Sequence, residues 1–281
     1  MYDAASLSDQ PTHQRAVGEL RLSVKLRDAA TVLDGLRQSG CLKARFPRPE
    51  RGAWMNAVTL NTSGGVAAGD RLSSTISAGE GTQVTIAAQA AERFYRALPG
   101  AAPAELRTRI SVGAGASFEW LPQETIFFDR CAMDRRLEVD LAPDAWFLGV
   151  ESLVFGRAAM GETVEHARIA DTIRIRRDGR LLLHDAIRID GEVAATLRRP
   201  AIAGAARAVA TLLHVAPDAE TGLDRLRSAF EGLSATCGAS AWDGMLIARI
   251  IASSSAELRA AVTNGLQILR NSRPIPRVWL C

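Results

Sequence analysis

Six carboxylates stand inside apolar runs or at turns, where a charge is hard to accommodate. Glu124 and Glu151 lie in the hydrophobic stretches LPQETIFF and LGVESLVF. The full set is Asp70, Glu92, Glu124, Asp129, Glu151 and Glu162. A buried carboxylate is costly unless it is paired, hydrated or bound to a metal ion. Hard oxygen ligands and water suit weak, transient binding of a divalent cation better than tight storage.

Two interpretations of these carboxylates stay open on the sequence alone. In the first, each forms an ordinary salt bridge with a nearby arginine, for which Arg93, Arg96, Arg130 and Arg157 are candidates. In the second, several of them line an internal wet path, or a docking surface, that handles a divalent cation.

Familiar catalytic signatures are absent from the sequence. The two Gly-x-Gly turns lack the third glycine and the following helix of a dinucleotide site, and there is no GxxxxGK[ST] phosphate loop. A GxSxG nucleophile elbow is also missing. The four histidines are isolated rather than paired at the spacing of a zinc site. We therefore predict a protein that is not an enzyme and holds no cofactor tightly.

The stretch between Leu60 and Arg157 repeats itself, which indicates how these carboxylates are positioned. Placing Ile76 on Ile110 aligns serines, glycines and a glutamine at a shift of 34 residues, and a weaker third copy begins 29 residues later at Val139. Each copy alternates apolar and polar residues around a glycine-rich turn, as two strands and a turn do. We predict a mainly β protein whose layers stack into a β-solenoid-like body.

Apolar alternation predicts strands along most of the chain. They are Gly18–Leu26, Thr31–Leu36, Trp54–Asn61, Arg71–Ser77, Gln83–Ala88, Leu106–Val112, Ser117–Leu121, Leu137–Leu141, Trp146–Phe155, Thr172–Arg176, Arg180–Ile189, Arg207–Val215 and Met245–Ile251.

Two α-helices are predicted near the C-terminus. The first has apolar residues at helical spacing from Leu223 to Leu233, and the second begins at a capping box formed by Ser254 and Glu257. The tail that follows, 274–279, is expected to be extended.

Composition places few further limits on the protein. Of 281 residues, 47% are hydrophobic and 23% charged, which is typical of a soluble globular protein. A net charge of +3 gives no strong attraction to nucleic acid or to a membrane, and no apolar run of about 18 residues could span one. We expect a disordered lead-in over residues 1–17 and one β-rich domain over 18–281. Four scattered cysteines favour a cytoplasmic protein with reduced thiols.

Five groups of residues occur in a distinctive order between Gly18 and Trp279. They are Asn61-Thr62-Ser63-Gly64-Gly65 with Gly69-Asp70-Arg71; Gln89-Ala90-Ala91-Glu92-Arg93 with Tyr95-Arg96; Trp120-Leu121-Pro122-Gln123-Glu124-Thr125-Ile126; Gly156-Arg157 with Gly161-Glu162; and Pro276-Arg277-Val278-Trp279. Together they resemble the urease accessory protein family UreD, called UreH in some bacteria. One departure is Ala68, where the family commonly has glycine.

The resemblance implies a non-catalytic scaffold with a β-rich body and two helices. It implies binding to the helical protein UreF, through UreF to the GTPase UreG, and docking on the urease apoprotein for GTP-dependent nickel insertion. A route for nickel through the interior is implied as well, with the metal held only transiently. The six carboxylates lie in or beside the matching motifs, which makes them hypothetical route or interface residues. Neither nucleic acid nor a membrane is an expected partner.

Two other functions fit parts of the sequence. A β-solenoid enzyme acting on an acidic polysaccharide would have a long open groove with clustered acids, although such enzymes usually carry a secretion signal and this N-terminus has none. A β interaction module without a metal role is the other alternative.

Overall fold

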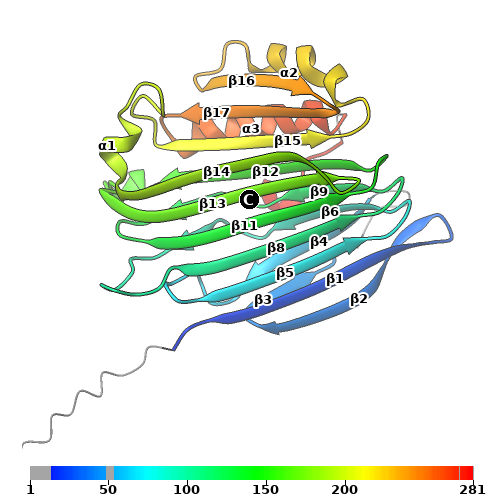
Figure 1. Cartoon of the computed structure of the whole chain (residues 1–281), viewed down its shortest axis with the longest axis horizontal. Helices are drawn as coiled ribbons and strands as arrows, with labels where there is room; N and C mark the ends of the chain where they lie inside the picture. The colour runs from blue at the N-terminus through cyan, green and yellow to red at the C-terminus, as the bar shows by residue number, and fades with distance from the viewer. Residues whose placement is uncertain (1–13, 49–53, 272, 281) are drawn as a thin grey trace, which may run out of the picture.

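The computed structural model describes residues 14–48, 54–271 and 273–280, and two β-sheets dominate these ranges (Figure 1). Sheet A contains, in spatial order, β14 (Arg180–Glu192), β13 (His166–Arg177), β11 (Ala132–Leu141), β8 (Ala104–Val112), β5 (Arg71–Ala78), β1 (Val17–Arg27) and β2 (Ala30–Gly40). Sheet B contains β16 (Thr236–Trp242), β17 (Met245–Ala252), β15 (Ala208–Val215), β12 (Trp146–Phe155), β9 (Ser117–Leu121), β6 (Gln83–Ala88), β4 (Met55–Asn61) and β3 (Leu42–Arg45). The short strands β7 (Glu92–Phe94) and β10 (Thr125–Phe127) pair with each other, and β10 also pairs with β12. The prediction of a mainly β protein is confirmed.

The central part of the chain winds from one sheet to the other. Strands β4, β6, β9 and β12 belong to sheet B, whereas the intervening β5, β8, β11 and β13 belong to sheet A. Within each sheet these strands are parallel; Ile76 lies opposite Ile110 and Ile110 opposite Val139. The sequence repeat therefore corresponds to one turn of this winding. The further description as a β-solenoid-like body stays a prediction, because antiparallel strands complete both sheets.

Sheet B is buried on both faces, and β9 illustrates the alternation. Phe118 packs in a cluster with residues of sheet A, whereas Leu121 packs with residues of the helices. Alternate side chains of a strand point to opposite faces, so one strand serves two cores. The face of sheet B that lies away from sheet A therefore requires a cover.

Two α-helices, α2 (Leu223–Phe230) and α3 (Ser255–Leu269), provide that cover beside β15, β16 and β17 (Figure 1). Both were predicted, and Ser254 accepts a hydrogen bond from the N–H of Glu257 at 3.2 Å, as expected of the capping box. The five-residue helix α1 (Val193–Leu197) was not predicted, because so short a segment has no helical periodicity. The 3-10 turns are Ala158–Met160, Ala219–Gly222 and Arg277–Trp279, and the last one replaces part of the expected extended tail.

The predicted lead-in falls mostly outside the described ranges, which begin at residue 14. In the described part, Val17 begins β1, and the N–H of Ala16 donates to Oδ1 of Asp70 at 2.8 Å. The assignment of 18–281 to a single domain stays a prediction. Across the described residues, no helix combines the length and apolar character needed to cross a bilayer.

A buried ion-pair cluster fastens the end of α3 to sheet B. The carboxylate of Glu119, which is fully buried, accepts hydrogen bonds from Nε and Nη2 of Arg270 at 2.9 and 3.0 Å. It also accepts from the Thr85 hydroxyl and from Arg273. All four side chains lie on the helical side of sheet B, so this cluster determines where the C-terminal segment leaves the helix.

We predict that Glu119→Ala lowers the free energy of unfolding by roughly 3–5 kcal/mol, because it leaves the buried guanidinium of Arg270 without its partner. Urea denaturation followed by circular dichroism measures this. Glu138→Ala is the control; its partner Arg109, 3.1 Å away, is exposed, so the loss should stay below about 1 kcal/mol. Equal losses for the two variants would contradict the prediction.

His214 is a buried base on the same face of sheet B. Its ring lies 5.1 Å from that of Trp146, and neither ring nitrogen has a hydrogen-bond partner among the described residues. Burial lowers the pKa of His214 to about 4. The folded protein therefore binds one proton fewer than the unfolded chain between pH 4 and the usual histidine pKa of 6.5.

We predict that His214 makes stability rise with pH by roughly 1.4 kcal/mol per unit across this window. Above pH 6.5 both states hold a neutral ring and the dependence ends. Unfolding free energies measured from pH 4.5 to 7 should therefore rise less steeply for His214→Phe than for the unsubstituted protein. His184→Phe, on the exposed side of β14, should keep the original slope.

Candidate functional site

The space between the two sheets is apolar at both ends and polar in the middle. On β11, Arg135 lies between Met133 and Leu137, which belong to two different apolar clusters. The same alternation places Asp171 on β13 and Glu151 on β12 between apolar neighbours. We name this layer the polar belt. Its members are Glu92, Arg135, Glu151, Asp171, Asp185 and Arg249.

Arg135 is the centre of the belt and joins the two sheets. Its Nη1 lies 2.8 Å from Oε2 of Glu151, and its Nε and Nη2 donate to the two carboxylate oxygens of Asp171 at 2.9 and 2.6 Å. The Trp120 indole N–H donates to the other oxygen of Glu151 at 3.2 Å. Both carboxylates and the guanidinium are buried, so this is a desolvated, hydrogen-bonded ion-pair network.

The belt continues across the other half of the sandwich. Arg249 on β17 donates to the Thr211 hydroxyl and, at 2.6 Å, to Asp185 on β14. A small cavity lies between these residues and the pair Glu151 and Asp171. The Arg249 side chain is 44% exposed, so this end of the belt reaches solvent.

At the other end, a cavity of about 280 Å³ lies beside Arg135 and Glu151. Glu92 lines it, and the Asn61 amide donates to both oxygens of the Glu92 carboxylate at 3.3 and 3.2 Å. Gly65 lies at its edge with φ +143°, and a Cβ there would come within 2.5 Å of the Tyr95 ring. Only glycine fits this position, which explains the Gly64-Gly65 pair in the sequence.

The charged side chains of the belt favour the binding of a positively charged group. Among its six members, four carboxylates face two guanidinium groups, and the excess of carboxylate lies toward Asp171 and Asp185, because Arg93 and Arg136 also line the cavity beside Glu92. Burial raises the pKa of Glu92, although Asn61 partly opposes the shift. Burial also raises the pKa of Glu151, against the opposing effect of Arg135. The belt can therefore exchange protons or attract a cation.

The belt is not a preformed metal centre. Within the described ranges, no group of three or more His, Cys, Asp or Glu side chains is arranged to hold a metal ion. Arginines occupy the carboxylate oxygens instead, so a cation passing along the belt would have to compete with them.

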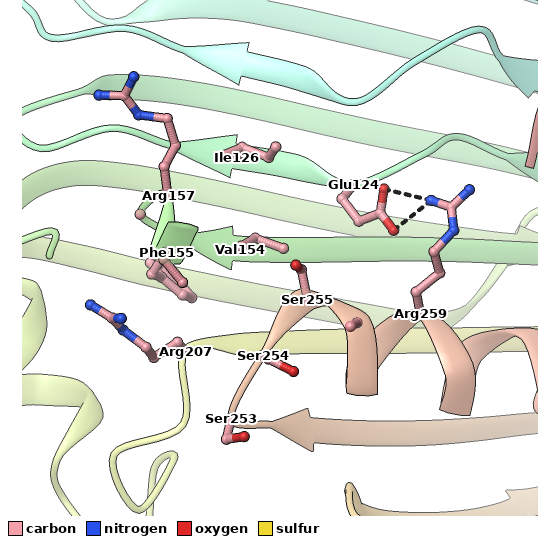
Figure 2. A pocket seen from close by; sticks show the side chains of 13 residues that line it. Glu124, Ile126, Val154, Phe155, Arg157, Arg207, Ser253, Ser254, Ser255 and Arg259 are labelled. Carbon is pink, nitrogen blue, oxygen red and sulfur yellow. Dashed lines mark hydrogen bonds and ion pairs between the residues drawn. The ribbon is translucent and has the colours of Figure 1, made fainter. Parts of the chain in front are cut away.

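Glu124, which was predicted as a site residue, lies outside the belt on the helical side. Its two oxygens accept from Nη1 of Arg259 on α3 at 2.9 and 3.1 Å (Figure 2). The same guanidinium donates to Oε1 of Gln123 and, at 2.5 Å, to the carbonyl of Trp279. Glu124 thus ties α3 and the C-terminal segment to sheet B.

The remaining three predicted acids shape turns or surface loops. Asp70 accepts backbone N–H groups of Ala16 and Ala67. Asp129 accepts those of Glu165 and His166, and these bonds lower its pKa although partial burial acts in the opposite sense. Glu162 binds Nε of Arg157 at 2.7 Å, which together with backbone N–H groups lowers its pKa against the effect of burial.

Several family-motif residues have local structural roles. The Gln123 amide donates to the carbonyls of Gln89 and Val278, and the Trp279 indole donates to the Leu121 carbonyl at 3.1 Å. Pro122 lines the 280 Å³ cavity. Nη2 of Arg96 lies 3.7 Å from Oδ2 of Asp129.

All five motif glycines take positive φ angles, among them Gly64 at +79° and Gly65 at +143°. Gly69 has φ +89°, Gly156 +86° and Gly161 +66°. Ala68 has no positive φ, so the departure at that position causes no backbone strain.

The charged residues that sequence reasoning missed share one signal. The predicted strands began at Leu137 and Thr172, just past Arg135 and Asp171, whereas β11 and β13 start earlier. Continuing the alternation toward the N-terminus would have placed both charges on the inward face. Their pairing with each other on neighbouring strands of sheet A, and that of Arg135 with Glu151 on sheet B, have no counterpart in local sequence.

The family model for "UreD urease accessory protein" matches residues 16–280. The urease accessory protein UreD of Xanthobacter autotrophicus is 43% identical over 275 residues, covering 98% of this chain and 93% of its own. UreD of a Methylobacterium species is 45% identical over 275 residues, covering 96% of each chain. UreD of Rhizobium etli is 46% identical over 266 residues, covering 95% of this chain and 96% of its own.

We predict that Arg135→Met costs roughly 3–5 kcal/mol of unfolding free energy near pH 7, because it leaves buried carboxylates unpaired. Loss of the guanidinium removes the effect that opposes the raised pKa of Glu151. The folded variant then holds more protons than the unfolded chain above pH 4.5, so its deficit should grow as pH rises and shrink as pH falls. Denaturation at pH 5 and 7.5 tests this. Arg174→Met, on the exposed side of β13, is the control, and a deficit independent of pH would refute the explanation.

Proposed function

This chain belongs to the UreD family of urease accessory proteins, and we propose that it serves urease maturation as a non-catalytic scaffold for GTP-dependent insertion of nickel into the urease apoprotein. It acts in a complex with UreF and, through UreF, with the GTPase UreG. The names of the relatives support an accessory role. We place this activity in the cytoplasm, where Cys41, Cys131 and Cys237, all free, stay reduced.

The observation that supports a metal role is the polar belt. Nickel, as cargo, enters beside Glu92 at the 280 Å³ cavity and passes Glu151 toward Asp185. Carboxylate, hydroxyl and amide oxygens along this line replace parts of the hydration shell one at a time. The excess of carboxylates over guanidinium groups attracts the cation, while the lack of a closed ligand cage lets it leave.

The polysaccharide-enzyme alternative receives less support from the geometry. It requires clustered acids in a long open groove, whereas the acids of the belt lie between two sheets and are paired with arginines. Among the six carboxylates named from the sequence, we retain Glu92 and Glu151 as route residues. Glu124 is assigned to the attachment of α3 instead.

We predict that Glu92→Gln combined with Glu151→Gln lowers urease activation on the order of tenfold, the usual range for loss of a metal-site group. Complex assembly should be unchanged, because both substitutions keep the side-chain shape. The measurement is urease activity and nickel content after co-expression, with assembly followed by co-purification of UreF and UreG. Glu138→Gln, on the outer face of sheet A, is the matched control and should leave activation unchanged.

Glu124→Ala should behave differently from the belt variants. It releases Arg259 and the C-terminal segment, so activation and assembly should fall together. Full activation by the Glu92→Gln, Glu151→Gln variant would remove the belt from the proposal. Lost assembly in that variant would point to a folding role.

A further inference from the structure

We propose that a cationic groove beside α3 binds an acidic peptide segment of a partner protein. The groove consists of two neighbouring cavities, of about 350 and 240 Å³, which share Phe155 and Arg207. We name it the arginine groove after Arg157, Arg198, Arg207 and Arg259, which line it. The first cavity lies beside α3 and the second between β12 and α1, and no residue of the polar belt lines either of them, so the two sites are distinct.

The floor of the groove is apolar. Ile126, Val154 and Phe155 lie along it between the arginines (Figure 2), and Leu197 and Ala206 continue it into the second cavity. A small hydrated anion would leave this floor in contact with water. A peptide with apolar side chains covers it and buries the area that gives protein contacts much of their affinity.

The charges of the groove are only partly compensated. Arg259 is paired with Glu124, and Nε of Arg157 is paired with Glu162. Nη2 of Arg207 donates to the Glu162 carbonyl and the Thr163 hydroxyl, which are neutral.

In the part of the chain that the structure describes, no carboxylate lies within ion-pair distance of Arg207 or Arg198. Figure 2 shows Arg157 and Arg207 beside Phe155, at the end of the cavity away from the Glu124–Arg259 pair. Carboxylates of the peptide supply the missing negative charge.

The arginines are held in place before any ligand arrives. Gly156 has φ +86°, and a Cβ there would come within 2.6 Å of the Glu162 carbonyl oxygen, so the loop can close only on glycine. The Arg157 guanidinium lies 4.0 Å from the centre of the Phe128 ring, a cation–π contact that fixes its direction. Preorganised side chains lose less entropy on binding.

The N-terminus of α3 also borders the groove, and its capping box occupies part of the first turn. The Ser254 hydroxyl accepts from the N–H of Glu257, and the Glu257 carboxylate accepts from the N–H and hydroxyl of Ser253. The guanidinium groups add full positive charges to the partial positive charge of this helix end.

The test measures the anisotropy of dye-labelled octapeptides at 50 and 500 mM salt. One probe alternates leucine and glutamate, and the others alternate leucine with lysine or with glutamine. The glutamate peptide should bind roughly tenfold or more tightly than the others, and its affinity should fall at high salt. Arg157→Gln with Arg207→Gln should weaken it by a similar factor, whereas Arg157→Lys with Arg207→Lys should restore part of the loss.

The matched control is Arg188→Gln with Arg225→Gln, which removes two exposed arginines outside the groove and should leave binding unchanged. Circular dichroism verifies that each variant folds. Equal binding of the glutamate and lysine peptides, no binding at all, or insensitivity to the Arg157 and Arg207 substitutions overturns the inference. Preference for an oligothymidylate probe over the glutamate peptide overturns it as well, in favour of nucleic acid.

The inference rests on the proposed function only in placing the partner within the maturation complex. Urease activation by the unsubstituted protein is measured in parallel in a host lacking its gene. Activation without peptide binding removes the groove alone, whereas peptide binding without activation removes the proposed function.

Discussion

The ion pair of Arg135 with Glu151 connects the two sheets at the level where apolar contact between them stops, and Asp171, the neighbour of Arg135 within sheet A, holds the same guanidinium. Above and below this level the sheets pack through aliphatic and aromatic side chains. Buried ion pairs seldom stabilise a fold more than well-packed apolar residues of the same volume. A charged layer here thus reduces the stability that this interior could have had, which argues for a role beyond packing. Attraction of a cation is a role that its charge balance can perform.

Two carboxylates of sheet B show how the alternation of a strand separates roles. Glu119 on β9 faces the helices and is enclosed by Arg270, Arg273 and Thr85. Glu151 on β12 faces sheet A and borders cavities on two sides. Both are buried and both bind arginine, yet the first has no space around it and the second does. The accessible volume around the carboxylate, more than the residue type, distinguishes a structural ion pair such as that of Glu119 from a candidate site such as that of Glu151.

The local patterns of the sequence predicted most of the strands and the two longer helices, but not the short strands β3, β7 and β10. The repeat of Ile76, Ile110 and Val139 predicted a register that the parallel strands adopt, because equivalent residues of successive turns lie side by side. Strand ends were less predictable, since the first residues of β11 and β13 include charged side chains such as Arg135 and Asp171. Strand β16 was missed, because its small residues give almost no alternation.

In the candidate site, two of the carboxylates could be predicted from the sequence, whereas the ion pairs between distant residues could not. Glu92 and Glu151 attract attention because each is an acid in an apolar context. Their guanidinium partner Arg135 sits in an ordinary polar stretch, and Asp185 and Arg249 are 64 residues apart in sequence. Such pairings are set by the distance between sheets, which no local pattern encodes. Glu124 looked equivalent to Glu151 on the sequence, and only the side of sheet B that it faces separates them.

One consequence of the winding concerns how such a chain can change length. Successive turns take 34 and 29 residues, yet the strands of both sheets stay in register. The stretch from Ala88 to Ala104 is longer than that from Leu121 to Ala132 by the whole of this difference, and both run along the edge that holds β7 and β10. The difference falls after the paired, buried Phe94 and Phe127, where residues 98–100 are exposed, so a loop of another length there can be accommodated while the scaffold keeps its shape.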